Sequence, residues 1–258
     1  MDAPLYPGWV VLHVPHDSVV IPPAVRDQFV LDDQALATEL VRMTDHRTLE
    51  IFAHRRSSAT IVRAEVSRLV VDVERFPDDE VEPMAARGMG AVYSATSHLQ
   101  QLRRPLHGDE REALMRTYYM PHHTRLEAAV SDALARYGAC LVLDCHSFAG
   151  TALPYEMAAA ERARPDICIG TDAFHTPPAL AEAFAESFGR ESWSVALNDP
   201  FSGALVPSGR YLLDQRISAV MVEVNRRLYI DEATSTPLTN FAEVARRIRR
   251  YCATAIER

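Results

Sequence analysis

Residues 139–147 read Ala-Cys-Leu-Val-Leu-Asp-Cys-His-Ser, five apolar residues followed at once by Asp144 and, two positions later, His146. A short apolar run of this kind is typical of a strand that is buried on both faces. The apolar run Trp9–Val14 is likewise followed by Pro15 and then by the reactive His16. The run 217–224 contains Glu223 near its end. Three buried strands therefore end in residue types that bind metals or transfer protons.

Apolar runs alternate with helical patterns along the rest of the chain. We expect helices over residues 31–52, 109–137 (in two pieces, because of Pro121), 177–188 and from Asn240 onward, where Glu243 would complete a capping box. Further strands are expected over 60–65, 69–73, 167–169 and 193–197. This alternation predicts a single α/β domain spanning residues 1–258, with a mainly parallel or mixed central sheet and helices on both faces.

The composition is that of a globular protein: 258 residues, 48% hydrophobic and 24% charged, with a net charge of −8. The negative charge argues against a nucleic-acid partner. The four cysteines form no CxxC pair, which favours reduced thiols. The N-terminus lacks a basic region, and no apolar run is long enough to span a bilayer. We therefore expect a cytoplasmic protein with no membrane partner; the oligomeric state stays open.

The carboxyl ends of parallel strands form the edge at which ligands bind in such sheets. His16, His146 and Glu223 are all expected at that edge. Two histidines and a carboxylate fit a zinc site that keeps one position open for water. His13 lies three residues before His16, but we interpret it as a core histidine, because the two would face opposite sides of a strand.

Short motifs along most of the chain resemble those of the N-formylglutamate amidohydrolase family. They are Val14-Pro15-His16-Asp17-Ser18, Asp45, residues 67–75 (Ser-Arg-Leu-Val-Val-Asp-Val-Glu-Arg), Pro121-His122-His123, Asp144-Cys145-His146-Ser147, residues 170–176, residues 198–203 and residues 223–229. The resemblance implies a fold like that of zinc carboxypeptidases and aminoacylases. It also implies a deformylase-like hydrolase of linear amides, working in histidine degradation.

The resemblance implies one Zn²⁺, or another divalent metal, held by His16, Asp45 and His146. The carboxypeptidase His-x-x-Glu is absent, because Val19 stands three residues after His16, so Asp45, expected on a helix, supplies the carboxylate and Glu65 is the reserve candidate. Glu223 resembles the general base of carboxypeptidases. It would accept a proton from zinc-activated water and return it to the leaving nitrogen.

The implied substrate is a small acidic N-acyl amino acid, which a protein of negative charge must hold with local cations. Arg68 and Arg75 match the family and have the planar fork that binds carboxylates. Arg210, Asn198 and His123 are further substrate-binding candidates. The chain departs from the family pattern at Asp17–Val19, at Glu74 in place of Asn, and at His122 in place of Tyr, all near the expected substrate side.

Two other functions stay open at this point. One is a zinc peptidase of carboxypeptidase or cell-wall type, which would share the metal and Glu223. The other is a non-catalytic metal- or ligand-binding protein of the same fold, which would have no need of a general base at Glu223.

Overall fold

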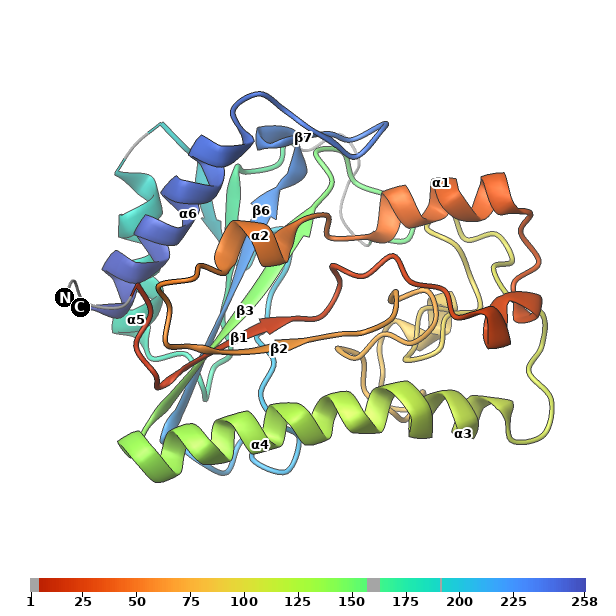
Figure 1. The fold of residues 1–258 in the computed structure, drawn as a ribbon, viewed down its shortest axis with the longest axis horizontal. Coiled ribbons are helices and arrows are strands. Elements are labelled where there is room, and N and C mark those ends of the chain that lie inside the picture. Colours follow the sequence, from red (N-terminus) through yellow and green to blue (C-terminus); the bar gives the residue numbers. More distant parts are fainter. Residues whose placement is uncertain (1–4, 157–162, 191) are drawn as a thin grey trace.

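The computed structural model describes residues 5–156, 163–190 and 192–258. Its centre is a six-stranded sheet of order β2-β1-β3-β6-β4-β5 (Figure 1). Neighbouring strands are parallel except that β4 runs antiparallel to β6, so the predicted α/β class with a mainly parallel or mixed sheet is confirmed. The strands are β1 (Val10–Val14), β2 (Thr60–Arg63), β3 (Cys140–Phe148), β4 (Ile167–Gly170), β5 (Val195–Leu197) and β6 (Ile217–Asn225), with a small β7 (Ile230–Asp231) and β8 (Thr236–Pro237) pair beside them.

Helices cover both faces of this sheet, and others lie beyond it. The α-helices of the described residues are α1 (Asp33–Met43), α2 (Thr48–Phe52), α3 (Glu110–Leu114), α4 (Met120–Tyr137), α5 (Pro178–Gly189) and α6 (Phe241–Ile256). The long α4 lies along one face, and α2, α5 and α6 lie on the other (Figure 1). Side chains of β1 alternate accordingly: Leu12 packs in the cluster with α5 and α6, whereas Val11 packs with Leu126 and Val130 of α4. No helix in the described ranges combines the length and apolar character needed to cross a membrane.

Two predicted helical regions are subdivided. Residues 109–137 form α3, a π-helical turn over Met115–Tyr119, and α4, with Pro121 in the first turn of α4. The backbone is helical throughout, with Leu114, Met115, Tyr119 and Met120 all in the right-handed helical region, so the missing N–H of Pro121 coincides with the change from π-helical to α-helical pairing. The region 31–52 is interrupted between α1 and α2, which places Asp45 in a loop rather than on the helix that we expected.

The strand expected over residues 69–73 is wrong. This segment consists of turns, in which the N–H groups of Val70 and Val71 bond back to the carbonyl of Ser67. Its apolar side chains are nevertheless buried, in a separate cluster that includes Tyr93 and Tyr119. The run of apolar residues that resembles a strand is therefore explained by burial within packed loops and not by a place in the sheet.

The expected capping box at α6 is also wrong. Asn240 precedes the helix but its side chain makes no capping hydrogen bond, and it donates instead to the carbonyl of Leu228. Glu243 pairs with Arg246 on the same helix.

Candidate active site

The sheet register brings the reactive strand ends together. β3 and β6 are paired over their full length, and His146 lies directly opposite Glu223. β1 pairs with the other edge of β3 and ends two residues before His16. His16, His146, Glu223 and Asp45 all line one cavity of about 690 Å³.

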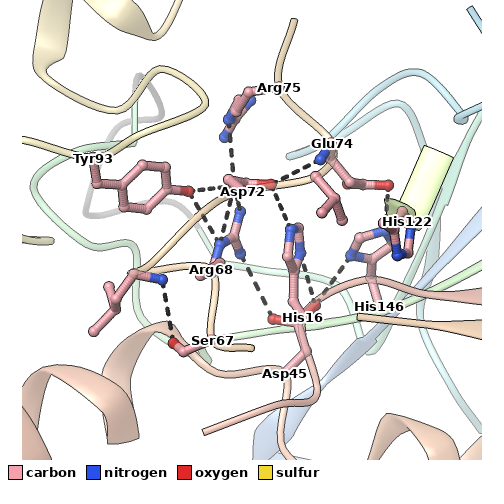
Figure 2. Close-up of polar contacts among 12 residues, drawn as sticks. His16, Asp45, Ser67, Arg68, Asp72, Glu74, Arg75, Tyr93, His122 and His146 are labelled. Atoms are coloured by element: carbon pink, nitrogen blue, oxygen red, sulfur yellow. Dashed lines mark hydrogen bonds and ion pairs between the residues drawn. The ribbon is translucent and has the colours of Figure 1, made fainter. Parts of the chain in front are cut away.

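Three ligand-type atoms point at one place in this cavity. His146 Nδ1 lies 3.0 Å from Asp45 Oδ2, and His16 Nδ1 lies 3.7 Å from the same oxygen (Figure 2). All three side chains are at least 96% buried. Within the described parts of the chain, His16 Nδ1 has no hydrogen-bond partner. This buried imidazole nitrogen lacks a partner and faces a carboxylate and a second imidazole. A cation bound between the three groups would satisfy it.

The donor set fits a tetrahedral divalent metal. With metal–ligand bonds of about 2.1 Å, neighbouring ligand atoms of such a site lie roughly 3.4 Å apart. The two separations from Asp45, 3.0 and 3.7 Å, lie on either side of that value. His16, Asp45 and His146 could therefore hold one ion with little movement.

The outer nitrogen of each histidine meets a buried carboxylate. His16 Nε2 donates to Asp72 Oδ1 at 2.8 Å, and His146 Nε2 lies 3.1 Å from Asp144 Oδ1. A carboxylate behind a ligating histidine fixes the ring orientation and the tautomer. Because both outer nitrogens carry hydrogen, both Nδ1 atoms are left to face Asp45.

The loop that carries Asp45 is held in place by β1 and by Arg226. The Asp45 N–H donates to the carbonyl of His16 at 3.0 Å. Arg226 Nη1 donates to the carbonyls of Arg42 and Thr44, at the end of α1. Arg226 thus ties the end of β6 to the segment that presents Asp45.

Glu223 occupies an apolar and negatively charged setting. Burial raises the pKa of Glu223 to about 8, an effect that the positive His146 opposes and the carboxylates of Asp45 and Glu74 reinforce. Its Oε2 atom is buried and has no hydrogen-bond partner among the described residues. An unpartnered carboxyl with a pKa near neutrality is suited to exchange protons at the site.

His146 itself is surrounded by carboxylates. Burial lowers its pKa, but Glu74 at 3.2 Å and Asp144 and Asp45 outweigh burial and raise the pKa well above its ordinary value. In the metal-free protein His146 therefore carries a proton that a metal ion has to displace.

The second carboxylate, Asp72, lies at the centre of a buried polar cluster. Arg68 donates to Asp72 Oδ2 from Nε and Nη2 (3.2 and 2.8 Å), and Tyr93 donates its hydroxyl to the same oxygen (Figure 2). Against the effect of burial, His16 and Arg68 hold the pKa of Asp72 well below its usual range. Arg75 lies farther from Asp72, at 3.6 Å, and it also lies 3.8 Å from Glu82.

The structure places the other predicted site residues elsewhere. Arg210 is paired with Glu127 and lines a separate surface groove together with His123. The side chain of Asn198 is hydrogen-bonded to Thr171. Glu65, the reserve ligand, is largely exposed and pairs with Arg125. Of the five candidate substrate-binding residues, Arg68 and Arg75 line the cavity of Glu223.

Comparison with known proteins places the chain in a family. The sequence profile of the N-formylglutamate amidohydrolase family matches residues 9–230. The chain belongs to this family. The resemblance stated from the motifs is thereby confirmed, as is the prediction of a hydrolase that acts on an amide bond.

Individual relatives agree with this assignment. The chain is 27% identical over 236 residues to an N-formylglutamate deformylase of Pseudomonas putida, covering 86% of this chain and 82% of the relative. Its fold is similar to that of an N-formylglutamate amidohydrolase from Ralstonia eutropha JMP134, with a TM-score of 0.80 at 23% identity, over 98% and 94% of the two chains. A gene product of Agrobacterium tumefaciens has a TM-score of 0.67 at 22% identity, over 97% and 91%.

Several buried polar residues around the site of this family member were assigned no role from the sequence. Asp72 and Asp144 stand behind the two histidines, His13 lies next to Asp144, Glu74 lies next to His146, and His122 lies next to His13. Asp144 could have been found, because it belongs to the same strand-end motif as His146. The contact between His13 and His122 joins residues 109 positions apart, and no local pattern predicts it.

Proposed function

We propose that this chain hydrolyses the amide of N-formylglutamate, or of a closely related N-acyl amino acid, at a divalent metal ion held by His16, Asp45 and His146. One arrangement carries the proposal: two imidazole Nδ1 atoms and a carboxylate converge beside the buried Glu223 in a single cavity. Family membership and the name of the Pseudomonas relative support the choice of substrate.

Zinc, or a similar ion, supplies a Lewis acid when bound and makes water nucleophilic near neutral pH. Glu223 takes up the proton that water loses and returns it to the leaving nitrogen. Its pKa is about 8 without a metal, and a cation held beside it would lower that value, so that near neutral pH the carboxylate can accept a proton and give it back. The surrounding cavity keeps bulk water away from these steps, because Glu223 is 93% buried.

Arg75 is the arginine best placed to receive a substrate carboxylate. Arg68 is already engaged by Asp72 and Tyr93, whereas the ion pairs that Arg75 makes among the described residues are 3.6 Å or longer. The buried Nε of Arg75 has no hydrogen-bond partner in the described ranges. We therefore assign the primary carboxylate contact to Arg75, and a supporting role to Arg68, which also faces Asp45 at 3.9 Å.

Arg75→Lys should raise KM for N-formylglutamate by roughly tenfold, the effect of losing one charge-assisted hydrogen bond of about 1.5 kcal/mol. The charge is kept and only the planar fork is lost, so kcat should change less than KM. Arg104→Lys is the matched control, because Arg104 makes a paired-fork contact with Glu110 outside the cavity. A KM within twofold of wild type would remove Arg75 from substrate binding.

The direct test of the function is formate release from N-formylglutamate before and after removal of metal by a chelator. We expect activity to disappear on chelation and to return when Zn²⁺ is added. A panel of dipeptides and N-acetyl amino acids, assayed in parallel, measures substrate preference. Dipeptide hydrolysis that exceeds formate release would replace the amidohydrolase proposal with a peptidase.

A further inference from the structure

We propose that His13 and His122 are positioning residues that act through Asp144 to hold His146 with its Nδ1 atom facing Asp45. The inference rests on the proposed metal site. It concerns a chain of side chains, His122–His13–Asp144–His146, which lies behind that site, away from Asp45 and His16.

The four side chains form a continuous and buried series of contacts. His13 Nε2 lies 2.8 Å from His122 Nε2, and His13 Nδ1 lies 2.7 Å from Asp144 Oδ1. The same oxygen of Asp144 is 3.1 Å from His146 Nε2. His13, His122 and Asp144 are each 1% exposed or less, so water does not compete for these contacts.

Three secondary-structure elements supply the chain. His13 of β1 and Asp144 of β3 are register partners, so their side chains leave the sheet together on the α4 face. His122 comes from the first turn of α4, just after Pro121. Movement of His146 is thereby opposed by two strands and a helix rather than by one neighbouring side chain.

One assignment of hydrogens gives every N–H in the chain an acceptor. The Asp144 carboxylate is placed to accept, because its Oδ1 faces His13 Nδ1 and His146 Nε2 and its Oδ2 accepts from the N–H of Leu205. His13 Nδ1 and His146 Nε2 must then both donate to Asp144 Oδ1. His13 Nε2 is left to accept, and His122 Nε2, 2.8 Å away, is the donor that faces it.

This assignment leaves one ring nitrogen, His122 Nδ1, without a partner. Among the described residues, His122 Nδ1 makes no hydrogen bond. If His122 donates from Nε2, Nδ1 carries only a lone pair. A lone acceptor atom is a more common unsatisfied group in protein interiors than a lone N–H.

The position of Asp144 depends on His13 because Glu74 competes for His146. Glu74 Oε1 lies 3.2 Å from His146 Nε2, close to the distance from Asp144. With His13 in place, Asp144 Oδ1 is fixed by His13, and Oδ2 is fixed by the N–H of Leu205 at 3.0 Å. Without His13, Asp144 loses one of these anchors and His146 is free to turn toward Glu74.

His13, Glu74 and Asp144 also form a group that could itself hold a cation. The 2.7 Å contact between His13 and Asp144 favours a hydrogen bond instead, since it is shorter than the usual separation of two ligands on one zinc ion. We therefore argue for a positioning role, and a second ion is an outcome that the experiment detects.

The test compares His13→Leu with His13→Asn in the full chain. The dissociation constant for Zn²⁺ is measured by competition with a chromophoric chelator, and bound zinc is counted by elemental analysis. His13→Leu should raise the dissociation constant by about 10- to 100-fold, the usual effect of removing a group behind a metal ligand. His13→Asn should stay close to wild type, because the asparagine amide nitrogen occupies nearly the place of Nδ1 and still donates to Asp144.

His175→Leu is the matched control. His175 is as buried as His13 and is fully hydrogen-bonded, to the carbonyl of Ile217 and the N–H of Leu212, at the opposite end of β6 from Glu223. Its loss should lower the melting temperature without changing the zinc dissociation constant. If His13→Leu does not fold, His122→Phe and His122→Gln replace the pair. The phenylalanine variant should weaken zinc binding, and the glutamine variant, which keeps a donor, should restore it.

Two results would overturn this inference and leave the proposed function standing. One is a zinc dissociation constant in His13→Leu equal to that of wild type. The other is two zinc ions in wild type and one in His13→Leu, which would make His13 a ligand. Wild-type protein that binds no zinc at all would instead refute the proposed function, and this inference with it.

Discussion

Glu223→Gln is expected to lower kcat by at least about a hundredfold, the usual loss when a general acid–base group is removed. Glutamine has nearly the same shape but can neither accept nor return the proton. The proposed ligands His16, Asp45 and His146 are untouched, so the zinc content should equal that of wild type. Measuring kcat, bound zinc and melting temperature on this one variant separates catalysis from folding.

The stability of the variant has a predictable sign. The pKa of Glu223 in the folded protein, about 8, lies above the value of about 4.3 for an unfolded glutamate. Metal-free wild-type protein therefore loses stability as the pH rises from about 4 toward 8, because folding disfavours the ionised carboxyl. Glu223→Gln removes that loss, so the melting temperature of the metal-free variant at pH 8 should equal or exceed that of metal-free wild type.

Glu39→Gln provides a matched control for this experiment. Glu39 is also a buried carboxylate, but it is held by Ser97 and by Arg42 and does not itself line the cavity of Glu223. Its replacement should lower the melting temperature and leave kcat unchanged. If Glu223→Gln instead lost stability and kept a near-wild-type kcat, Glu223 would be structural and the proposed catalytic role would be lost.

His146→Ala should abolish both metal binding and activity. The variant keeps Asp45 and His16 but has only two ligands, so the zinc dissociation constant should rise by more than about a hundredfold, beyond the effect of outer-shell changes. The carboxylates that raise the pKa of His146 also predict a pH dependence for the wild type. Because binding displaces a proton, zinc affinity should fall as the pH is lowered.

Elemental analysis after gel filtration, together with formate release, checks this second prediction. His175→Ala is its control, because it removes a buried histidine that has no contact with the site. Full zinc content in His146→Ala would show that the ion is bound elsewhere in the chain.

The residues at the strand ends could be predicted from sequence because the fold class determines where they meet. Once residues 9–14, 139–143 and 217–224 are interpreted as buried parallel strands, His16, His146 and Glu223 share one edge without further information. Asp45 is different. It lies in the loop between α1 and α2, and no periodicity indicates the direction of a loop side chain, so only the family motif identified it.

The residues behind the histidines could not be predicted, because their partners are distant in sequence. Asp72 lies in a segment that resembles a strand but consists of buried turns, which hid the fact that its carboxylate faces His16. His13 was expected in the core and is fully buried. Its hydrogen bond to Asp144 follows from the β1–β3 register, which is a property of the sheet and not of either strand.

The pairing of β3 with β6 fixes the spacing of His146 and Glu223 independently of the shape of the cavity around them. His146 and Glu223 are held opposite each other by backbone hydrogen bonds, at the spacing of about 4.8 Å between adjacent strands. Insertions in the loops at the cavity rim can reshape the space for the acyl group and the amino acid without altering that spacing. A single inserted residue within β6 before Glu223 would turn its carboxyl toward the opposite face, where α5 and α6 pack. Changes in the rim loops could therefore alter substrate preference while the proposed ligand His146 and the proposed base Glu223 keep their spacing.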